Sequence, residues 1–351
     1  MRNYLVLLIT TLTILINSQY RVLAQDSSGV QYRGTIIEIL EETTEESRVI
    51  YQKLLVRLSN KENVEVENKT RETGRNLTYR VGDKVILQSF EVGETQTMFI
   101  TDYDRTGFLI FIFAVFTILS VMIGKKHGLY SVVGMIFSFF IIFKFMLPQI
   151  VSGKNPIIIT ILTALLITPI TFYLSHGFNK KTHVSIFSTG IALILTSILT
   201  SLSISLAKLT GYSTEEAVFL QVSVESINMK GILLSGIIIG LLGILDDVTV
   251  SQSSTVMQLK KLNPNMGTLE LYQNAMVIGR DHITSMINTL VLVYAGAAMP
   301  LLLLFSNSQQ PALFVVNMES VSEEIIRTLL GSIGLIMVVP ISTFFAAVVA
   351  E

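Results

Sequence analysis

The chain has 351 residues, of which half are hydrophobic and only 15% are charged. A soluble globular protein carries charge on roughly a quarter of its residues, so this composition indicates a membrane protein. The chain has no Cys, which excludes disulfides and thiolate metal sites. With a net charge of −1 and no basic tail, we expect no nucleic acid as a partner.

Charge is concentrated near the beginning of the chain. Residues 26–105 hold 15 of the 26 acids and 11 of the 25 Lys and Arg, and the remainder is nearly charge-free outside short loops. This distribution predicts a soluble domain followed by a membrane domain. In residues 1–24, a basic residue, an apolar stretch and the pair Val22 and Ala24 predict a signal peptide cleaved after Ala24. The alternative is an uncleaved N-terminal anchor, and either one places residues 26–105 outside the cytoplasm.

The domain over 26–105 is predicted to be rich in β-strands. Apolar and polar residues alternate with period two in five segments, separated by turn signals. The segments are VQYRGTIIEIL, VIYQKLLVRLS, ENVEVEN, DKVILQSF and TQTMFITDY. Five short strands in so few residues predict a small barrel or sandwich. We see no catalytic constellation among them.

Seven apolar segments follow, each close to the ~20 residues that a helix needs to cross a bilayer. They are 107–124, 128–147, 156–174, 184–207, 231–250, 283–305 and 325–349. We therefore expect an all-α polytopic membrane bundle of seven transmembrane helices over 106–351. Alternate loops carry the positive charge, including Lys125, Lys180 and Lys260. The positive-inside rule places those loops and the C-terminus in the cytoplasm, and the β domain outside it.

The stretch Gly236–Thr255 begins as an ordinary membrane helix and then carries two carboxylates and several hydroxyls. Steps of three and four residues place six residues of this stretch, glycines included, on one helical face. These are Gly236, Gly240, Gly243, Asp247, Ser251 and Ser254. Small residues let helices approach closely in a bilayer, so the three glycines are predicted to pack against another helix. Asp246 points ~100° away from that face.

A carboxylate at membrane depth must be paired, protonated, or in contact with water or an ion. The functional interpretation of Asp247 is an ion or proton site. The alternative is that the helix ends near Val250, which would leave both acids close to the lipid headgroups.

The sixth and seventh segments add further candidates. Arg280 and Asp281 begin the sixth segment, and Asn288 is its deepest polar side chain. One possibility is an Asp247–Arg280 ion pair, which would hold Asp247 ionised. The alternative is that the Arg280 side chain extends to the membrane interface and does not pair with Asp247. In the seventh segment Gly331 and Gly334 share a packing face, and Pro340 is predicted to kink the helix. No His pair has metal-site spacing and there is no P-loop, so we expect neither a metal nor a cofactor.

These residues form a pattern that resembles the YibE/F-like family of bacterial multipass membrane proteins. The pattern combines Gly240, Gly243, Asp247, Val248 and Ser251 with Gly279-Arg280-Asp281, Asn288-Thr289-Leu290, Gly331-Ser332-Ile333-Gly334 and Pro340. An exported domain before the spans is similar to the YibE branch. The resemblance implies a location in the bacterial cytoplasmic membrane, but it carries no established activity. Asp246 departs from the family's commoner single-Asp pattern.

The leading hypothesis is a transporter or permease component, without enzyme activity. Its site would comprise Asp247, Asp246, Ser251, Asn288, Arg280 and Asp281. The alternative is a non-catalytic envelope scaffold whose exported domain binds a partner. A third hypothesis is an intramembrane aspartyl protease, which would need Asp247 and Asp281 to face each other. The segment GILDD lacks the GxGD sequence expected of such an enzyme, which disfavours this hypothesis.

Expected partners are the lipid bilayer and either a second family-related membrane subunit or further copies of the chain. Pocket geometry separates the two leading hypotheses. A water-reachable polar cavity at Asp247 favours transport, whereas a dry packed contact favours the scaffold.

Overall fold

The computed structural model describes residues 30–44, 49–71, 78–92, 95–224, 226–307 and 310–351. The signal peptide or anchor expected over 1–24 lies outside the described residues. The chain divides into two compact units, which meet within the first long helix. One unit extends to Met122 and the other runs from Ile123 to Glu351.

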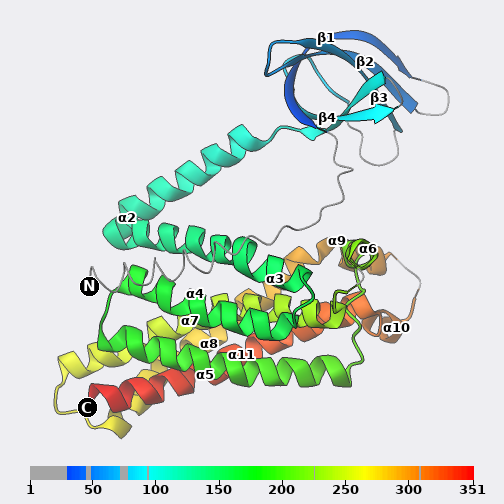
Figure 1. Cartoon of the computed structure of the whole chain (residues 1–351). Coiled ribbons are helices and arrows are strands. Elements are labelled where there is room, and N and C mark those ends of the chain that lie inside the picture. Colours follow the sequence, from blue (N-terminus) through cyan, green and yellow to red (C-terminus); the bar gives the residue numbers. More distant parts are fainter. Residues whose placement is uncertain (1–29, 45–48, 72–77, 93–94, 225, 308–309) are drawn as a thin grey trace. The chain divides into compact units, whose positions relative to one another are not determined.

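The first unit contains the five expected strands, which form one curved antiparallel sheet (Figure 1). The strand order is β3-β2-β1-β4-β5, so β1 lies at the centre of the sheet. The strands are β1 (Gln31–Thr44), β2 (Val49–Leu58), β3 (Asn63–Arg71), β4 (Lys84–Val92) and β5 (Thr95–Tyr103). Alternate residues such as Leu54, Val56 and Leu87 fill a core on the inner face of the sheet.

Gly34 allows the central strand to curve. A Cβ at this position would lie 2.5 Å from Val56 Cγ1 and 3.1 Å from Leu87 Cδ1, on the two flanking strands. Only a residue without a side chain leaves room for β2 and β4 at the same point of β1.

The first long helix, α2 (Thr106–Ile141), is interrupted once by non-helical backbone. Lys125 has φ 51° and ψ −130°. After this break the helix continues through a π-helical turn, η1 (Ile142–Met146), into α3 (Leu147–Val151). Together they form 46 residues of apolar helix. This exceeds twice the ~20 residues of one bilayer crossing.

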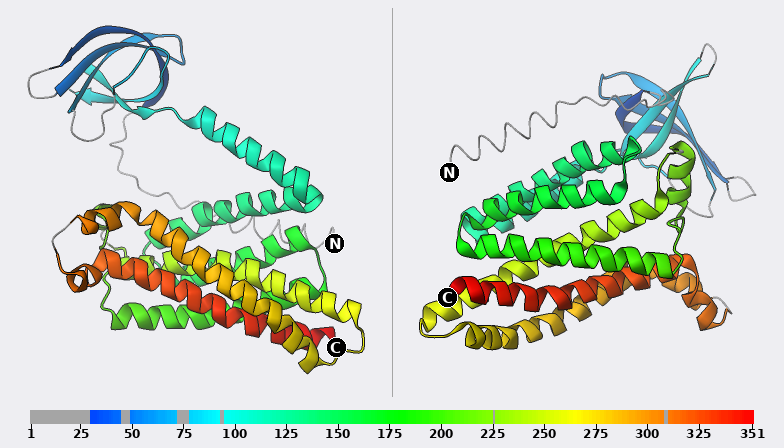
Figure 2. Two further views of the ribbon diagram at one scale, coloured as in Figure 1. Left: turned by 180° about the vertical axis from the view of Figure 1, so that it is seen from behind. Right: turned by 60° about the horizontal axis from the view of Figure 1, so that its bottom comes forward.

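The other helices begin at recognisable caps. The side chains of Asn155, Asn179 and Asn228 accept backbone N–H groups in the first turns of α4, α5 and α7. The long helices α4, α5, α7, α8 and α11 lie side by side (Figures 1 and 2). The elements are α4 (Pro156–His176), α5 (Lys180–Leu206), α6 (Glu215–Ser223), α7 (Met229–Leu262), α8 (Thr268–Ala297), α9 (Met299–Ser306), α10 (Ala312–Val316) and α11 (Glu319–Ala350).

By length and composition, five described helices could cross a membrane, or six if α8 and α9 form one bent span. The helical class is therefore confirmed, whereas the count of seven is not. The single helix expected over 283–305 is wrong, because the chain bends by 70° between α8 and α9. Pro300 lies in the first turn of α9, where it cannot donate to the carbonyl of Gly296 and its ring clashes with that group.

Helix α7 lies at the centre of the helical unit and packs most extensively against α5 and α11. Its side toward these helices is wholly apolar in the middle, with Ile237, Ile238, Leu241, Leu245 and Val248 at most 2% exposed. Burial of these side chains among α5 and α11 fixes the rotation of α7. The polar side of α7 that carries Asp246, Asp247 and Ser251 consequently faces away from both helices. Thr249 and Ser253 lie on the opposite side and are buried.

Candidate functional site: a cleft on α7

The polar side of α7 forms the floor of a cavity of about 890 Å³. Four helices supply its lining: α4, α5, α7 and α8. The lining includes Thr171, Phe172, Ser175, His176, Lys181, Gly243, Asp246, Asp247, Val250, Ser251, Ser254, Thr255, Gln258, Leu259, Leu262 and Ile278. Carboxylates, hydroxyls, an imidazole and one ammonium group therefore converge on a single space inside the helical unit.

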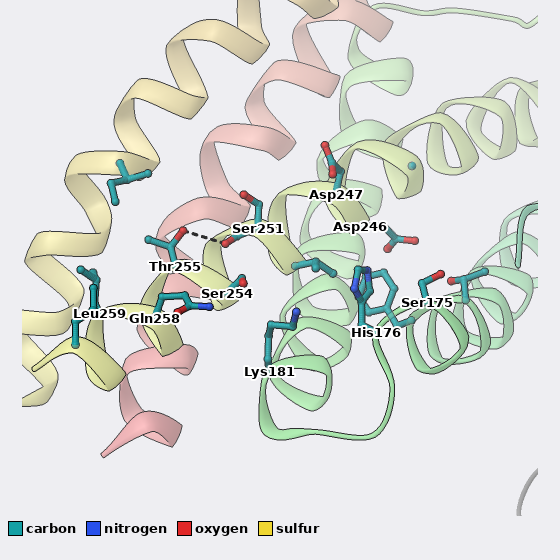
Figure 3. A pocket seen from close by; sticks show the side chains of 16 residues that line it. Ser175, His176, Lys181, Asp246, Asp247, Ser251, Ser254, Thr255, Gln258 and Leu259 are labelled. Carbon is teal, nitrogen blue, oxygen red and sulfur yellow. Dashed lines mark hydrogen bonds between the residues drawn. The ribbon is translucent and has the colours of Figure 1, made fainter. Parts of the chain in front are cut away.

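The two adjacent carboxylates occupy different environments. Asp247 is exposed, whereas Asp246 is partly buried. Figure 3 shows the Asp246 carboxylate on the side of α7 toward Ser175, and the Asp247 carboxylate pointing away from it. Oδ1 of Asp246 is shielded from solvent and has no hydrogen-bond partner among the described residues. Asp246 is thus the more enclosed of the two acids, although it was expected to point away from the helical face that carries Asp247.

Beside Asp246, the wall of the cavity is formed by neutral polar groups of α4. Thr171 donates to the carbonyls of Ile167 and Thr168, at 3.0 and 3.1 Å. Ser175 Oγ accepts from Ser131 Oγ at 3.4 Å. The Ser175 carbonyl lies 2.7 Å from the imidazole of the exposed His127. Thr171 and Ser175 therefore line the cavity beside Asp246, and among the described residues no ion pair joins Asp246 to a positive charge.

The positions of the two acids along α7 bear on one part of the alternative, the end of the helix near Val250. Asp246 and Asp247 lie at the middle of α7, which runs from Met229 to Leu262. The expectation that the helix ends near Val250 is therefore wrong. Ser251 and Thr255 continue the same helix, where Thr255 Oγ1 donates to the Ser251 carbonyl at 3.1 Å (Figure 3). The carboxylates are side chains of an unbroken helix and not caps at its end.

The packing role expected for Gly236, Gly240 and Gly243 is not found within the chain. All three glycines are exposed, and a Cβ at Gly236 or Gly243 would have nothing within 4 Å. At Gly240 the nearest group is the hydroxyl of Tyr294, at 3.6 Å. These glycines line an open face of α7 instead of a helix–helix contact. The reason is that α5 and α11 cover the opposite, more hydrophobic side.

Three further candidates, Arg280, Asp281 and Asn288, do not belong to the cavity. All three are exposed on α8, and none lines the cavity. The Asp247–Arg280 ion pair is not formed. In the described helices the ion pairs join Arg327 to Glu323 and Glu324, at the first turns of α11. Of the six candidates, Asp246, Asp247 and Ser251 are brought together, and no pair of apposed Asp from α7 and α8 lines the cavity.

Close helix packing instead involves Gly279 and Gly334. A Cβ at Gly279 would lie 2.7 Å from Val339 Cγ1 and 2.9 Å from Gln252 Nε2. At Gly334 it would lie 3.0 Å from Thr196 Cγ2, and Gly331 is buried on the same face of α11. These glycines bring α11 against α5, α7 and α8. Helix α11 continues without interruption through Pro340.

Buried hydroxyls join α5, α7 and α11 behind the cavity. The Thr249 carbonyl accepts from Ser185 at 3.2 Å and from Ser342 at 3.1 Å. Thr249 Oγ1 lies 2.8 Å from Thr189 Oγ1, and Ser342 Oγ lies 3.1 Å from Ser253 Oγ. This network was not predicted. The signal was present in α5, where hydroxyl residues recur every three or four positions, which is typical of interhelical hydrogen bonding in membranes.

The model of the family described as YibE/F-like protein matches residues 112–351. The chain belongs to the YibE/F-like family. The matched region contains every lining residue of the cavity, whereas the β sheet lies before it. No curated protein and no solved structure matches the chain. Family membership thus confirms the resemblance, and the chain is a multipass membrane protein.

Proposed function

We propose that the chain is a transporter or permease component, in which the cleft on α7 binds the transported species. The cavity with two carboxylates within the long helix α7, next to its apolar segment, is the observation that supports this proposal. A scaffold has no need for charge in such a position, because an uncompensated carboxylate opposes insertion by a few kcal/mol. The exposure of Asp247 meets the criterion of a polar cavity that water can reach.

The cavity favours a cationic or proton-coupled species. Asp246 and Asp247 carry the negative charge, and the hydroxyls of Ser251, Ser254 and Thr255 supply further oxygens. Hydroxyls and carboxylates together replace the hydration shell of a small cation or of an ammonium group. Lys181 also belongs to the lining, and its ammonium group limits the net negative charge. The chain would act with a related membrane subunit or as a homo-oligomer.

The proposed topology has seven spans, with the apolar helix of 46 residues crossing twice by reversing at Lys125. The β sheet is then outside the cytoplasm and Glu351 is inside. Single-Cys labelling tests this arrangement, because the chain has no native Cys. We expect Lys154→Cys to react with an impermeant maleimide in intact cells, and Lys180→Cys to react only after lysis. Both positions are exposed. Labelling of Lys180→Cys in intact cells would contradict the proposed orientation and place this loop outside the cytoplasm.

Transport is tested by flux measurements on the full chain in proteoliposomes, across a panel of monovalent and divalent cations and with an imposed pH gradient. We expect the wild type to move at least one species. We expect Asp247→Asn and Asp246→Asn each to lower that flux by ten-fold or more, because each removes an ionisable carboxyl group from the cavity. Melting temperatures in detergent establish that the variants are folded.

Asp281→Asn is the matched control. It makes the same chemical change in a membrane helix, at an exposed acid that does not line the cavity. We expect this variant to retain wild-type flux. Equal flux in all three folded variants would remove the carboxylate site from the proposal. A folded wild type that moves none of the panel would favour the scaffold, with the exported domain binding a partner.

A further inference from the structure

The two acids in the cavity are not equivalent, and the difference indicates which ion Asp246 binds. One carboxylate oxygen of Asp246 has neither solvent nor a hydrogen-bond partner among the described residues. An ionised carboxylate is an acceptor at both oxygens, so an enclosed oxygen without a donor strongly disfavours the charged form. The neutral acid, by contrast, carries its own donor. The surroundings of Asp246 therefore suit a protonated side chain.

The charged and titratable groups that face Asp246 are few. Asp247 is next to it on α7, His176 lies on α4 and Lys181 on α5. Helix α8 contributes only Ile278 to the cavity, and α11 contributes no lining residue. None of these groups forms an ion pair with Asp246 within the described part of the chain. The nearest like charge is Asp247, which opposes a second negative charge one residue away.

Within the part of the chain that the structure describes, Asp246 does not belong to a cluster of His, Asp and Glu that could hold a metal ion. Among the described residues, no group of three His, Asp or Glu side chains could hold a metal ion. A divalent cation needs several oxygen ligands arranged around one point, whereas a proton needs only one carboxylate oxygen. An enclosed carboxylate oxygen without a donor, outside any such cluster, therefore suits a proton.

We propose that Asp246 is the proton-binding group of the cavity and that Asp247 is the group that contacts the transported species; this assignment rests on the proposed transport function. The proton passes between the Asp246 carboxyl oxygen and water in the cavity, which leaves a carboxylate and a hydronium ion. Once Asp246 is ionised, its charge lies one residue from that of Asp247. A cation bound at Asp247 then favours release of the proton, and loss of the cation favours its return.

Infrared difference spectroscopy of the purified full chain, between neutral and alkaline buffer, tests the protonation directly. We expect the wild type to show the carbonyl stretch of a protonated carboxylic acid at neutral pH. That band should disappear in Asp246→Asn and remain in Asp247→Asn and in the exposed control Asp281→Asn. Asp246→Asn should also melt at or above the wild-type temperature, because the amide is a neutral analogue of the protonated acid.

A band that persists in Asp246→Asn, or that disappears only in Asp247→Asn, would overturn the assignment. If Asp246→Asn does not fold, Asp246→Glu is the second variant, and its carbonyl band should shift in frequency. A band that follows Asp246 without any solute flux would leave Asp246 as the proton-binding group, and it would contradict transport and the role given to Asp247. Flux that requires Asp246 without a protonated band would support transport and contradict the assignment.

Discussion

Gly279→Leu is expected to prevent or severely weaken folding of the helical unit, whereas Gly243→Leu is expected to leave its stability unchanged or slightly raised. At Gly279 even a methyl group would overlap Val339 of α11 and the amide of Gln252. Overpacking of a close contact destabilises by ~1–3 kcal/mol, and a leucine at this point should reach the upper end of that range or exceed it. At Gly243 the side chain would enter open space.

Melting temperature in detergent and the yield of monodisperse protein measure this difference. Both variants make the same change in a membrane helix, so differences in helix propensity and hydrophobicity cancel between them. Gln252 strengthens the expectation, because its amide donates to the Ala275 carbonyl at 2.9 Å and is not free to move away. Equal melting temperatures for the two variants would mean that α8 does not pack against α7 and α11 as closely as the structure indicates.

Much of the architecture could be predicted, because it depends on local patterns. The alternation in segments such as DKVILQSF has the period of a strand, and β4 forms there. Four of the apolar segments became α4, α5, α7 and α11, since a long apolar run without charge has few alternatives to a helix. The bend after Ala298 also had a local signal, Pro300, which lies within the segment that was expected to be straight.

The direction in which α7 faces could not be predicted from its sequence. The spacing of Gly236, Gly240 and Gly243 is the same whether the glycines meet another helix or line an opening. Which of the two arrangements forms depends on how much apolar surface the opposite face of α7 buries against α5 and α11. That face, with Leu241 and Leu245 fully enclosed, determines the rotation. The same rotation turns Asp246 toward α4 and leaves Asp247 exposed, so that Asp246 is the more enclosed of the two acids.

The rest of the candidate site depends on residues that meet only in three dimensions. Ser175 on α4 and Lys181 on α5 line the same cavity as Asp246, although more than 60 positions separate them from it in the sequence. Without an alignment of related sequences, no local pattern links such residues. Arg280 and Asp281 illustrate the converse. Their expected position at the start of the next helix, on the same side of the membrane as Asp247, suggested contact with it. Helix α8 instead presents them on its exposed side.

Gly243→Phe is expected to fold normally and to lose transport, and this combination separates the transporter from the scaffold. Gly243 lines the cavity three and four residues before Asp246 and Asp247. At this helical spacing its side chain would lie next to both carboxylates. A Cβ atom at Gly243 has nothing within 4 Å and opens onto the cavity, so we expect the stability of the unit to change by no more than ~0.5 kcal/mol.

The same ring would occupy the space in front of the carboxylates and exclude water and ions from them. We therefore expect flux in proteoliposomes to fall by ten-fold or more in Gly243→Phe. Gly243→Ala is the graded control, and because its methyl group is small it should retain most of the flux. A scaffold makes no use of the cavity, so it would tolerate Phe and Ala equally in any assay of complementation. A folded Gly243→Phe that transports like the wild type would therefore exclude this cleft as the route, whichever of the two acids were involved.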